Sequence, residues 1–384
     1  MNFKSISSYA VILCSLLVNS CDRVSHEQSD TKVTYVNHTP IKRQSIGNCW
    51  LYAKSTWLES MLKVTTGKTI KVSETYWTYW DFYWKLRNNI PLSPTELNTA
   101  GSWRLAKNIV NQYGWVEEKH FISAEAGQQM SEAQKCALDY IDQSIAVGGV
   151  LHDAMQRSPE LIRSELDKGF SCNGKYQVDM ASALQHRQMA SKTILLDIHT
   201  GERRTLTEWL EKWIEVDNNA HRAWSYYEGK KLPSLTAMKS YRMLSQRIKK
   251  ALNDHQPVVL SFYVSFNAPN EYGLFNLNTF AKNGSLGESG GHLIVLHDYT
   301  VNNVAGVGRI GEGDMSDEMK AQALTGDLDY LVAKNSWGAN RIDRPWLRDG
   351  YSRLSWKYLT SHYYDEERGY FYPFLTGVVL PPGY

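Results

Sequence analysis

The sequence has little net charge, few cysteines and no metal-binding pattern, and each shortage excludes a class of function. Its 42 Lys and Arg residues nearly balance its 40 Asp and Glu residues, which leaves a formal charge of +2. Without a basic stripe or an RNA-binding signature, we expect no nucleic-acid partner. The five cysteines include no Cys-x-x-Cys pair, and the histidines form no His-x-x-x-His cluster. We therefore expect neither a metal nor another cofactor.

The chain also lacks a long apolar run near its start. The run at residues 9–18 is too short for a membrane-spanning helix. It follows a basic residue and leads into a small-residue cleavage site that ends in Cys21, an arrangement that resembles a bacterial lipoprotein signal. It predicts that residues 1–20 are removed, that Cys21 is lipidated, and that residues 21–39 tether the protein to the periplasmic or outer face of a cell-envelope membrane. A plain secretory signal or a weak anchor is the alternative.

One cysteine lies in a setting typical of a nucleophile. Cys49 follows the loop at residues 44–48 and begins a stretch with helical spacing of its apolar residues. At a helix N-terminus the macrodipole and the unpaired N–H groups favour negative charge, which predicts a lowered thiol pKa. A cysteine beside a tryptophan is more often a small buried residue. Cys49 therefore needs a base and an oxyanion site before it can be called catalytic.

Two later segments offer the missing partners. Gly291 and His292 precede an apolar strand, where glycine allows close backbone approach and the imidazole would stand at the strand start. Residues 330–334 predict a second strand, followed directly by Asn335, whose side chain could hold the imidazole in the productive tautomer. Trp337 could cover that hydrogen bond from water. We predict His292 as the base and Asn335 as the residue that orients it.

These motifs, in this order, resemble the papain-like cysteine peptidases. Shared features are Gln before Cys-Trp, Gly-His at a strand, and Asn-Ser-Trp-Gly after the next strand. The loop at residues 47–51 and the aromatic helix that follows Ser73 and Glu74 are most similar to the bleomycin hydrolase and aminopeptidase C branch. The resemblance covers roughly residues 40–120 and 245–360.

The resemblance implies a role for each site residue. Peptide hydrolysis would pass through a thioester on the nucleophile, while the base protonates the leaving amine and then activates water. A peptide or protein is therefore the expected substrate. The implied roles are Cys49 as nucleophile, His292 as general base and acid, Asn335 as orienter, Gln44 with the Cys49 N–H as oxyanion hole, and Gly101, Gly291 and Trp337 as substrate-binding residues.

The chain departs from the family pattern at two positions. Gln44 lies five residues before Cys49 where the family has six, and Ala100 replaces the first of two glycines. These departures motivate a second hypothesis, a catalytically inactive papain-like binding protein. A transglutaminase-like acyl transferase, or a cysteine hydrolase of cell-wall peptides, would use the same residues. Papain-type zymogen control is not expected, because the segment between Cys21 and Cys49 is short.

The resemblance implies an α+β papain-like fold. A helical left half and a β-barrel-like right half would enclose the active-site cleft within one domain, residues 40–384. A large helical insert, at about residues 125–250, would separate nucleophile from base. A monomer and a homo-oligomer are both open. Helical patterns are predicted at residues 131–147, 157–168, 178–191, 205–217 and 235–253.

Two further parts of the sequence are a possible cysteine pair and the segment between the two catalytic strands. Cys136 and Cys172 could form one disulfide in an oxidising compartment or remain two buried thiols, and both readings stay open. Residues 304–328, between the two catalytic strands, contain glycines and acidic residues and are expected to form a solvated loop.

Overall fold

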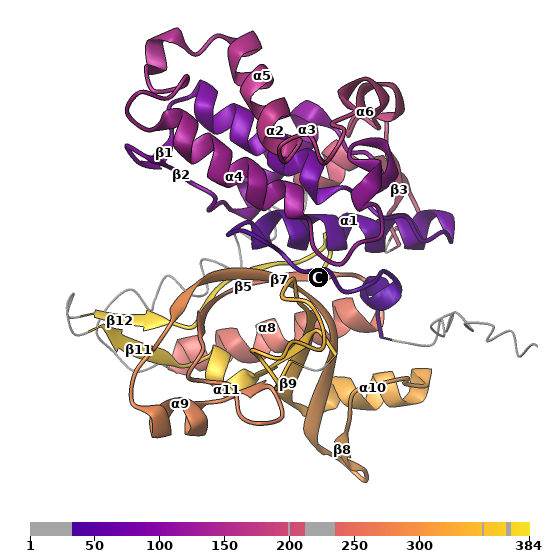
Figure 1. The fold of residues 1–384 in the computed structure, drawn as a ribbon. Coiled ribbons are helices and arrows are strands. Elements are labelled where there is room, and N and C mark those ends of the chain that lie inside the picture. The colour runs from indigo at the N-terminus through magenta and orange to yellow at the C-terminus, as the bar shows by residue number, and fades with distance from the viewer. Residues whose placement is uncertain (1–32, 199, 212–234, 348, 366–369) are drawn as a thin grey trace, which may run out of the picture.

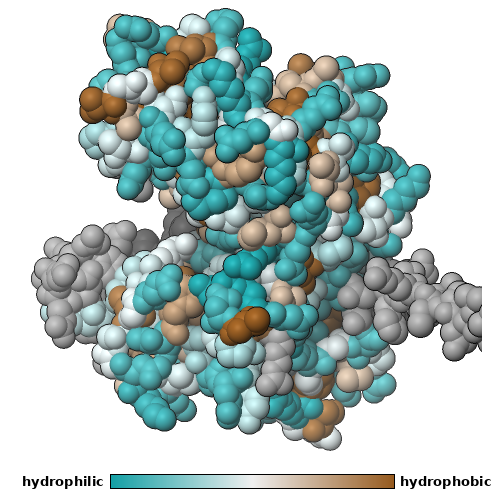
Figure 2. All heavy atoms as spheres, in the orientation of Figure 1, coloured by the Kyte–Doolittle hydropathy of each residue, from teal (hydrophilic) through white to brown (hydrophobic). Residues whose placement is uncertain are grey.

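The protein is a mixed α+β structure in which one half is mainly helical and the other holds the main sheet together with α8, α9, α10 and α11 (Figure 1). In the space-filling view the halves are two lobes that meet at a waist (Figure 2). The α+β class expected from the sequence is confirmed. The computed structural model describes residues 33–198, 200–211, 235–347, 349–365 and 370–384.

The predicted signal peptide, residues 1–20, and the lipidated Cys21 lie outside the described residues. Residues 33–39, expected at the end of the tether, are instead packed on the protein. Val36 is fully buried, and Thr34 donates a hydrogen bond from Oγ1 to the His297 carbonyl at 2.9 Å. The folded part therefore begins before residue 40. In the described part of the chain, no helix is both long and apolar enough to cross a membrane.

Four helices of the helical half begin with a serine cap. Ser73, Ser102, Ser131 and Ser158 each accept a hydrogen bond from the N–H three residues later, which satisfies a donor that the first turn leaves unpaired. The elements are 3-10 helix η1 (Tyr35–His38), α1 (Cys49–Thr66), α2 (Glu74–Arg87), β1 (Pro91–Ser93), β2 (Glu96–Leu97), α3 (Trp103–Tyr113), η2 (Glu118–His120), η3 (Ser123–Glu125), α4 (Glu132–Ile145), η4 (Ala154–Gln156), α5 (Pro159–Phe170), α6 (Met180–His186), β3 (Ile194–Leu196) and β4 (Arg203–Thr205).

The predicted insert helices α4, α5 and α6 pack into the same core as the helices that follow Cys49, whereas α8 packs in the core of the sheet half. Ile141 of α4, Leu166 of α5 and Trp209 are fully or almost fully buried in one cluster with the aromatic residues of α2. Helices α4, α5 and α8 match their predicted ranges within a few residues, and α6 is shorter than predicted. Residues 206–211 are helical, and the rest of the helix predicted at 205–217 lies outside the described residues. The boundaries of the insert stay a prediction.

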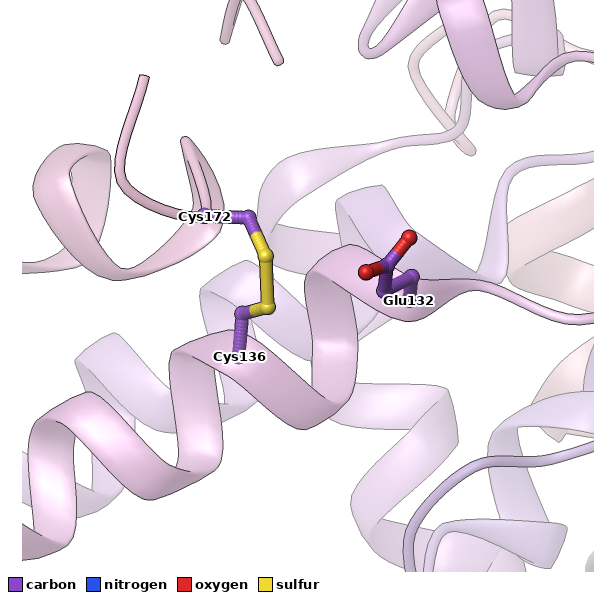
Figure 3. Close-up of side chains that lie close together, drawn as sticks. All are labelled: Glu132, Cys136 and Cys172. Atoms are coloured by element: carbon purple, nitrogen blue, oxygen red, sulfur yellow. A yellow bond between two sulfur atoms is a disulfide. The ribbon is translucent and has the colours of Figure 1, made fainter. Parts of the chain in front are cut away.

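A disulfide joins Cys136 of α4 to Cys172, just beyond α5 (Figure 3). The sequence leaves open whether these cysteines are bonded or remain free thiols, and the structure shows that they are bonded. Glu132 lies near both sulfurs, and these three residues are the one cluster of potential metal ligands in the described part of the chain. The cluster is explained without a metal, because both sulfurs are bonded and Glu132 pairs with Lys175 and Tyr176.

The second half is built on a seven-stranded mixed sheet in the order β13-β5-β7-β9-β10-β6, with β8 paired to β7. Neighbours are antiparallel except β6 and β10, which are parallel. The elements are α8 (Leu235–Asn253), β5 (Val258–Ser265), β6 (Leu274–Phe275), α9 (Leu277–Asn283), β7 (Ser289–Val304), β8 (Gly308–Ile310), α10 (Asp317–Thr325), β9 (Asp327–Lys334), β10 (Tyr351–Ser355), α11 (Trp356–Leu359), β11 (His362–Asp365), β12 (Tyr370–Pro373) and β13 (Leu375–Val379).

The expected β-barrel-like half needs a correction, because this sheet is open. Closure requires the two edge strands to pair, and no pairing joins β13 to β6 within the described residues. The two-residue strand β6 pairs with β10 and, through Phe275, with Pro269. The segment at 304–328 is also not the expected loop, since it contains β8 and α10. Lys249 of α8 donates to carbonyls at the end of α10, a long-range contact that favours the helix.

Alternate residues of β5 and β7 enter two different cores. Val259 and Val295 pack in the cluster that includes α1, whereas Leu260, Ile294 and Leu296 pack in the cluster that includes α8. This follows from the period of two in a strand, whose successive side chains point to opposite faces. Figure 1 shows α1 lying along β7 where the halves meet. Burial of β7 on both faces fixes the start of that strand relative to α1.

Candidate active site

Cys49 is the first residue of α1, as the sequence predicts. Asn48 precedes the helix but does not cap it; its side-chain amide donates to Thr78 Oγ1 and to Gln134 Oε1, both at 2.9 Å. These bonds tie the nucleophile loop to α2 and α4. The backbone N–H groups of Leu293, Trp50 and Cys49 itself act on the Cys49 thiol and lower its pKa. Leu293 follows His292 directly on β7, so the sulfur lies near the strand that carries the candidate base.

The thiol does not have the lowered pKa that the helix start predicts. Cys49 is only 8% exposed, and burial raises the pKa of its thiol. The backbone N–H groups lower the pKa, as expected for a helix N-terminus, but they do not outweigh the loss of water. The sequence reveals the helix start, whereas the depth of burial depends on the tertiary structure.

His292 and Asn335 lie together with geometry that defines the imidazole tautomer. His292 Nε2 is 2.8 Å from Asn335 Oδ1. The Ser336 backbone N–H donates to the same Oδ1 at 2.7 Å, and Asn335 Nδ2 donates to Ser352 Oγ at 2.7 Å. A backbone N–H can only donate, so the atom facing the imidazole is an oxygen and Nε2 carries the proton. The lone pair is then on Nδ1.

Trp337 covers the imidazole. Its ring stacks on that of His292 with centroids 4.5 Å apart and planes inclined by 22°. His292 is 3% exposed, and burial lowers its pKa to about 4, although the hydrogen bond to Asn335 acts in the opposite direction. The positive charge of Arg344 lowers this pKa further. Taken one at a time, both the thiol and the imidazole are therefore favoured in their neutral forms at pH 7.

A cavity of about 510 Å³ lies between the two halves and contains both Cys49 and His292 in its lining. One wall comes from the start of α1 and the segment before α3, and the other comes from β5, β7 and β13. Its lining residues are Gly47, Cys49, Trp50, Ala100, Gly101, Ser102, Trp103, Arg104, Val259, Ser261, Gly291, His292, Leu293, Thr376, Gly377 and Val379.

Packing requires a glycine at one of the two candidate substrate-binding glycines, Gly101, but not at the other, Gly291. A Cβ on Gly101 would overlap the ring of Trp50, whose Nε1 donates to the Thr99 carbonyl at 3.0 Å. Gly101 is thus required for packing beside the nucleophile. A Cβ on Gly291 would meet nothing within 4 Å. Packing does not require glycine there, and a side chain would extend into open space at the cavity.

Gln44 is held by protein groups on both ends of its side-chain amide. Nε2 donates to the Ile46 carbonyl at 2.9 Å, and Oε1 accepts a hydrogen bond from Ser336 Oγ at 2.6 Å. The Gln44 side chain is not among the residues that line the described cavity. Its role in an oxyanion hole stays a prediction, and its observed role is to join the nucleophile loop to the segment after β9.

Sequence analysis missed a buried charged cluster next to the site. Lys42 Nζ lies 3.4 Å from Glu59, 2.8 Å from Glu74 and 2.7 Å from Glu118. Burial opposes its charge, yet the three carboxylates hold the pKa of Lys42 well above its usual value. Lys334 Nζ, directly before Asn335, donates to the Thr39 carbonyl at 2.7 Å. In the sequence, the signal for this cluster was Glu59, a carboxylate among the apolar residues of α1.

No protein-family model and no curated protein matches this chain. One similar solved structure is that of PepW from Lactobacillus rhamnosis HN001, with 12% sequence identity and a TM-score of 0.38 over 92% of this chain and 82% of that one. A likeness at this level carries no argument about activity, so the functional interpretation depends on the geometry of the site.

Proposed function

We propose that this protein is a cysteine peptidase with Cys49 as nucleophile, His292 as base and acid, and Asn335 as orienter. The observation that carries the proposal is the hydrogen bond between His292 Nε2 and Asn335 Oδ1, in a site where His292 shares a cavity with Cys49. This bond leaves the Nδ1 lone pair available to take a proton. A buried cysteine without an oriented base nearby would be explained by packing alone.

In the proposed reaction the Cys49 thiol passes its proton to His292 Nδ1 as sulfur attacks the peptide carbonyl. The carbon–nitrogen bond then breaks, the imidazolium gives its proton to the leaving amine, and a thioester remains on Cys49. Water attacks the thioester while His292 takes a proton from it, which releases the acid and restores the thiol. Backbone N–H groups at the start of α1 would stabilise the oxyanion.

Proton transfer within the pair fits the buried environment of both groups. Burial opposes a net charge on either group alone, but transfer from sulfur to imidazole creates two opposite charges and no net charge. We further propose that the substrate is a peptide held extended beside Gly101. By the signal at the N-terminus, the enzyme would be anchored through lipid on Cys21 at the bacterial cell envelope.

The deciding experiment is labelling with an epoxysuccinyl inhibitor of cysteine peptidases at neutral pH. We expect the wild type to be labelled, and Cys49→Ala and His292→Ala not to be. Cys136 and Cys172 form a disulfide, so label should be found on Cys49 alone among the described cysteines. A folded wild type that takes no label would exclude the peptidase proposal.

One observation favours a second function, non-catalytic peptide binding. The Gln44 amide donates to Ile46 and not into the cavity, so a usual oxyanion donor is engaged elsewhere. A binder would retain peptide affinity in Cys49→Ala and show no label and no hydrolysis in the wild type.

A further inference from the structure

The cavity beside Cys49 has a single charged side chain among its described lining residues, apart from the titratable catalytic pair. Arg104, the second residue of α3, is exposed and faces this space. The other lining residues are apolar or small and polar, and none of those described is acidic. Apolar side chains line both walls, with Trp50 and Trp103 on the side of Arg104 and Val379 on the side of the sheet.

Arg104 differs from the cations near it in having no counter-charge. Lys107, one turn further along α3, pairs with Glu211 at 2.6 Å. Lys85, which contacts the Ala100 carbonyl, pairs with Asp81 at 2.7 Å. No hydrogen bond or ion pair within the described part of the chain holds the Arg104 guanidinium. It is therefore available to a ligand in the cavity.

A second arginine reinforces the positive charge from beyond His292. The Arg344 guanidinium lies 5.0 Å from the Trp337 ring and 4.2 Å from the Phe266 ring, and its charge acts on His292. Asp343 beside it is paired with Arg341, and the charges of Glu288 and Asp343 act on the Arg344 guanidinium. Positive charge thus flanks the candidate catalytic residues, although the whole chain carries a net charge of only +2.

We propose that the peptide bound in this cavity carries a carboxylate that pairs with Arg104, next to an apolar residue that lies between Trp50 on one wall and Val379 on the other. The inference depends on the proposed function in treating the cavity as the substrate site. A guanidinium pairs with a carboxylate through two parallel hydrogen bonds, which an amide of the same shape cannot reproduce. The carboxylate belongs either to an Asp or Glu side chain or to a peptide C-terminus.

The test is peptide binding to the Cys49→Ala protein, measured by calorimetry at low salt. The peptides are apolar and capped at both ends. Each has Glu, Gln or Lys at a single position, and every position along the peptide is tested in turn. At one position we expect Glu to bind about tenfold more tightly than Gln, the size of a partly exposed charge-assisted hydrogen bond. A further pair compares a free C-terminal carboxylate with its amide, and a preference confined to this pair assigns the carboxylate to the terminus.

Substitutions at Arg104 decide whether that residue is responsible for the preference for a carboxylate. Added to Cys49→Ala, Arg104→Gln should remove the preference for Glu, Arg104→Lys should retain part of it, and Arg104→Glu should shift it toward Lys. Arg87→Gln is the matched control, because Arg87 is exposed and lies outside the cavity lining. Three outcomes would overturn the inference. Peptides with Glu and Gln bind equally at all positions and the free C-terminus is not preferred over its amide; no peptide binds; or the preference for a carboxylate survives Arg104→Gln.

Hydrolysis by the wild type separates this inference from the proposed function. If Cys49→Ala shows an Arg104-dependent carboxylate preference while the wild type neither takes label nor cleaves peptides, the peptidase proposal fails and the inference stands. If the wild type cleaves capped peptides carrying Glu, Gln and Lys at equal rates, and its Cys49→Ala variant binds them equally and shows no preference for a free C-terminal carboxylate, the peptidase proposal stands and the inference fails.

Discussion

The two halves position their reactive groups by different means. In the helical half, side chains from distant segments hold Cys49: Asn48 bonds to α2 and α4, and Trp50 packs on Gly101. In the sheet half, the backbone ladders of β7 with β5 and β9 fix the strand that carries His292. Single substitutions should therefore perturb the nucleophile through packing, whereas the base should be perturbed mainly through its orienting side chains.

The largest effects are expected where the orientation of the base is removed. Asn335→Ala should lower kcat/KM by about a hundredfold or more, because the imidazole loses its tautomer and its position. Ser352→Ala should cost about tenfold, since Ser352 only holds the Asn335 amide. Steady-state kinetics on one capped peptide measures both. An Asn335→Ala rate equal to the wild type would contradict the assigned role.

In the helical half, the disulfide should contribute the most to stability. It closes a loop with a sequence separation of 36 residues, for which the chain-entropy estimate is about 4 kcal/mol. The double substitution Cys136→Ser and Cys172→Ser should lower the free energy of unfolding by roughly that amount, measured in denaturant. Labelling of Cys49 should be unaffected under native conditions, and a loss of label would show that the disulfide shapes the site.

Packing beside the nucleophile can be compared with packing beside the base by two matched substitutions. Gly101→Ala should destabilise the protein by about 2 kcal/mol, since its Cβ overlaps the Trp50 ring. Gly291→Ala meets open space and should leave the free energy of unfolding almost unchanged. Thermal unfolding of both variants provides the comparison. Equal destabilisation would contradict the proposed difference between the halves.

Lys54 offers a substitution that should stabilise the helical half. Its amine is fully buried, has no hydrogen-bond partner among the described residues, lies 2.9 Å from the Trp103 ring centroid, and has its pKa held well below the usual value by burial. Because the unfolded chain binds this proton more tightly than the buried amine does, the lowered pKa disfavours folding at pH 7. Lys54→Met should raise the free energy of unfolding by about 1 kcal/mol. A lower melting temperature would refute this.

The smallest expected effect is the change of activity between pH 7 and pH 5. Because burial lowers the pKa of His292 to about 4, the base stays unprotonated over this range and kcat/KM should change less than about twofold. Below pH 4 the rate should fall with each unit of pH. An unshifted histidine, with a pKa near 6.5, would instead lose about 25-fold between pH 7 and pH 5.

Several local features could be predicted because neighbouring residues determine them. The helix start at Cys49, the strand that ends before Asn335, and the aromatic helix α2 all follow from periodicity and capping. The helix and strand within 304–328 could not be predicted, because contacts from α8 favour that helix. Ser352 and Lys42 were missed for a similar reason, since their partners lie far away in the sequence.

The sequence by itself determined the candidate nucleophile, base and orienter, because each stands in a short motif beside a helix or strand end. Only the tertiary structure decided that the sheet is open, that Cys136 and Cys172 are bonded, and that burial raises the thiol pKa. It also decided that Arg104 lines the cavity and has no ion pair with any of the described residues. The physical reason is that solvation, bonding distance and charge neutralisation depend on which distant segments meet, and local periodicity does not contain that information.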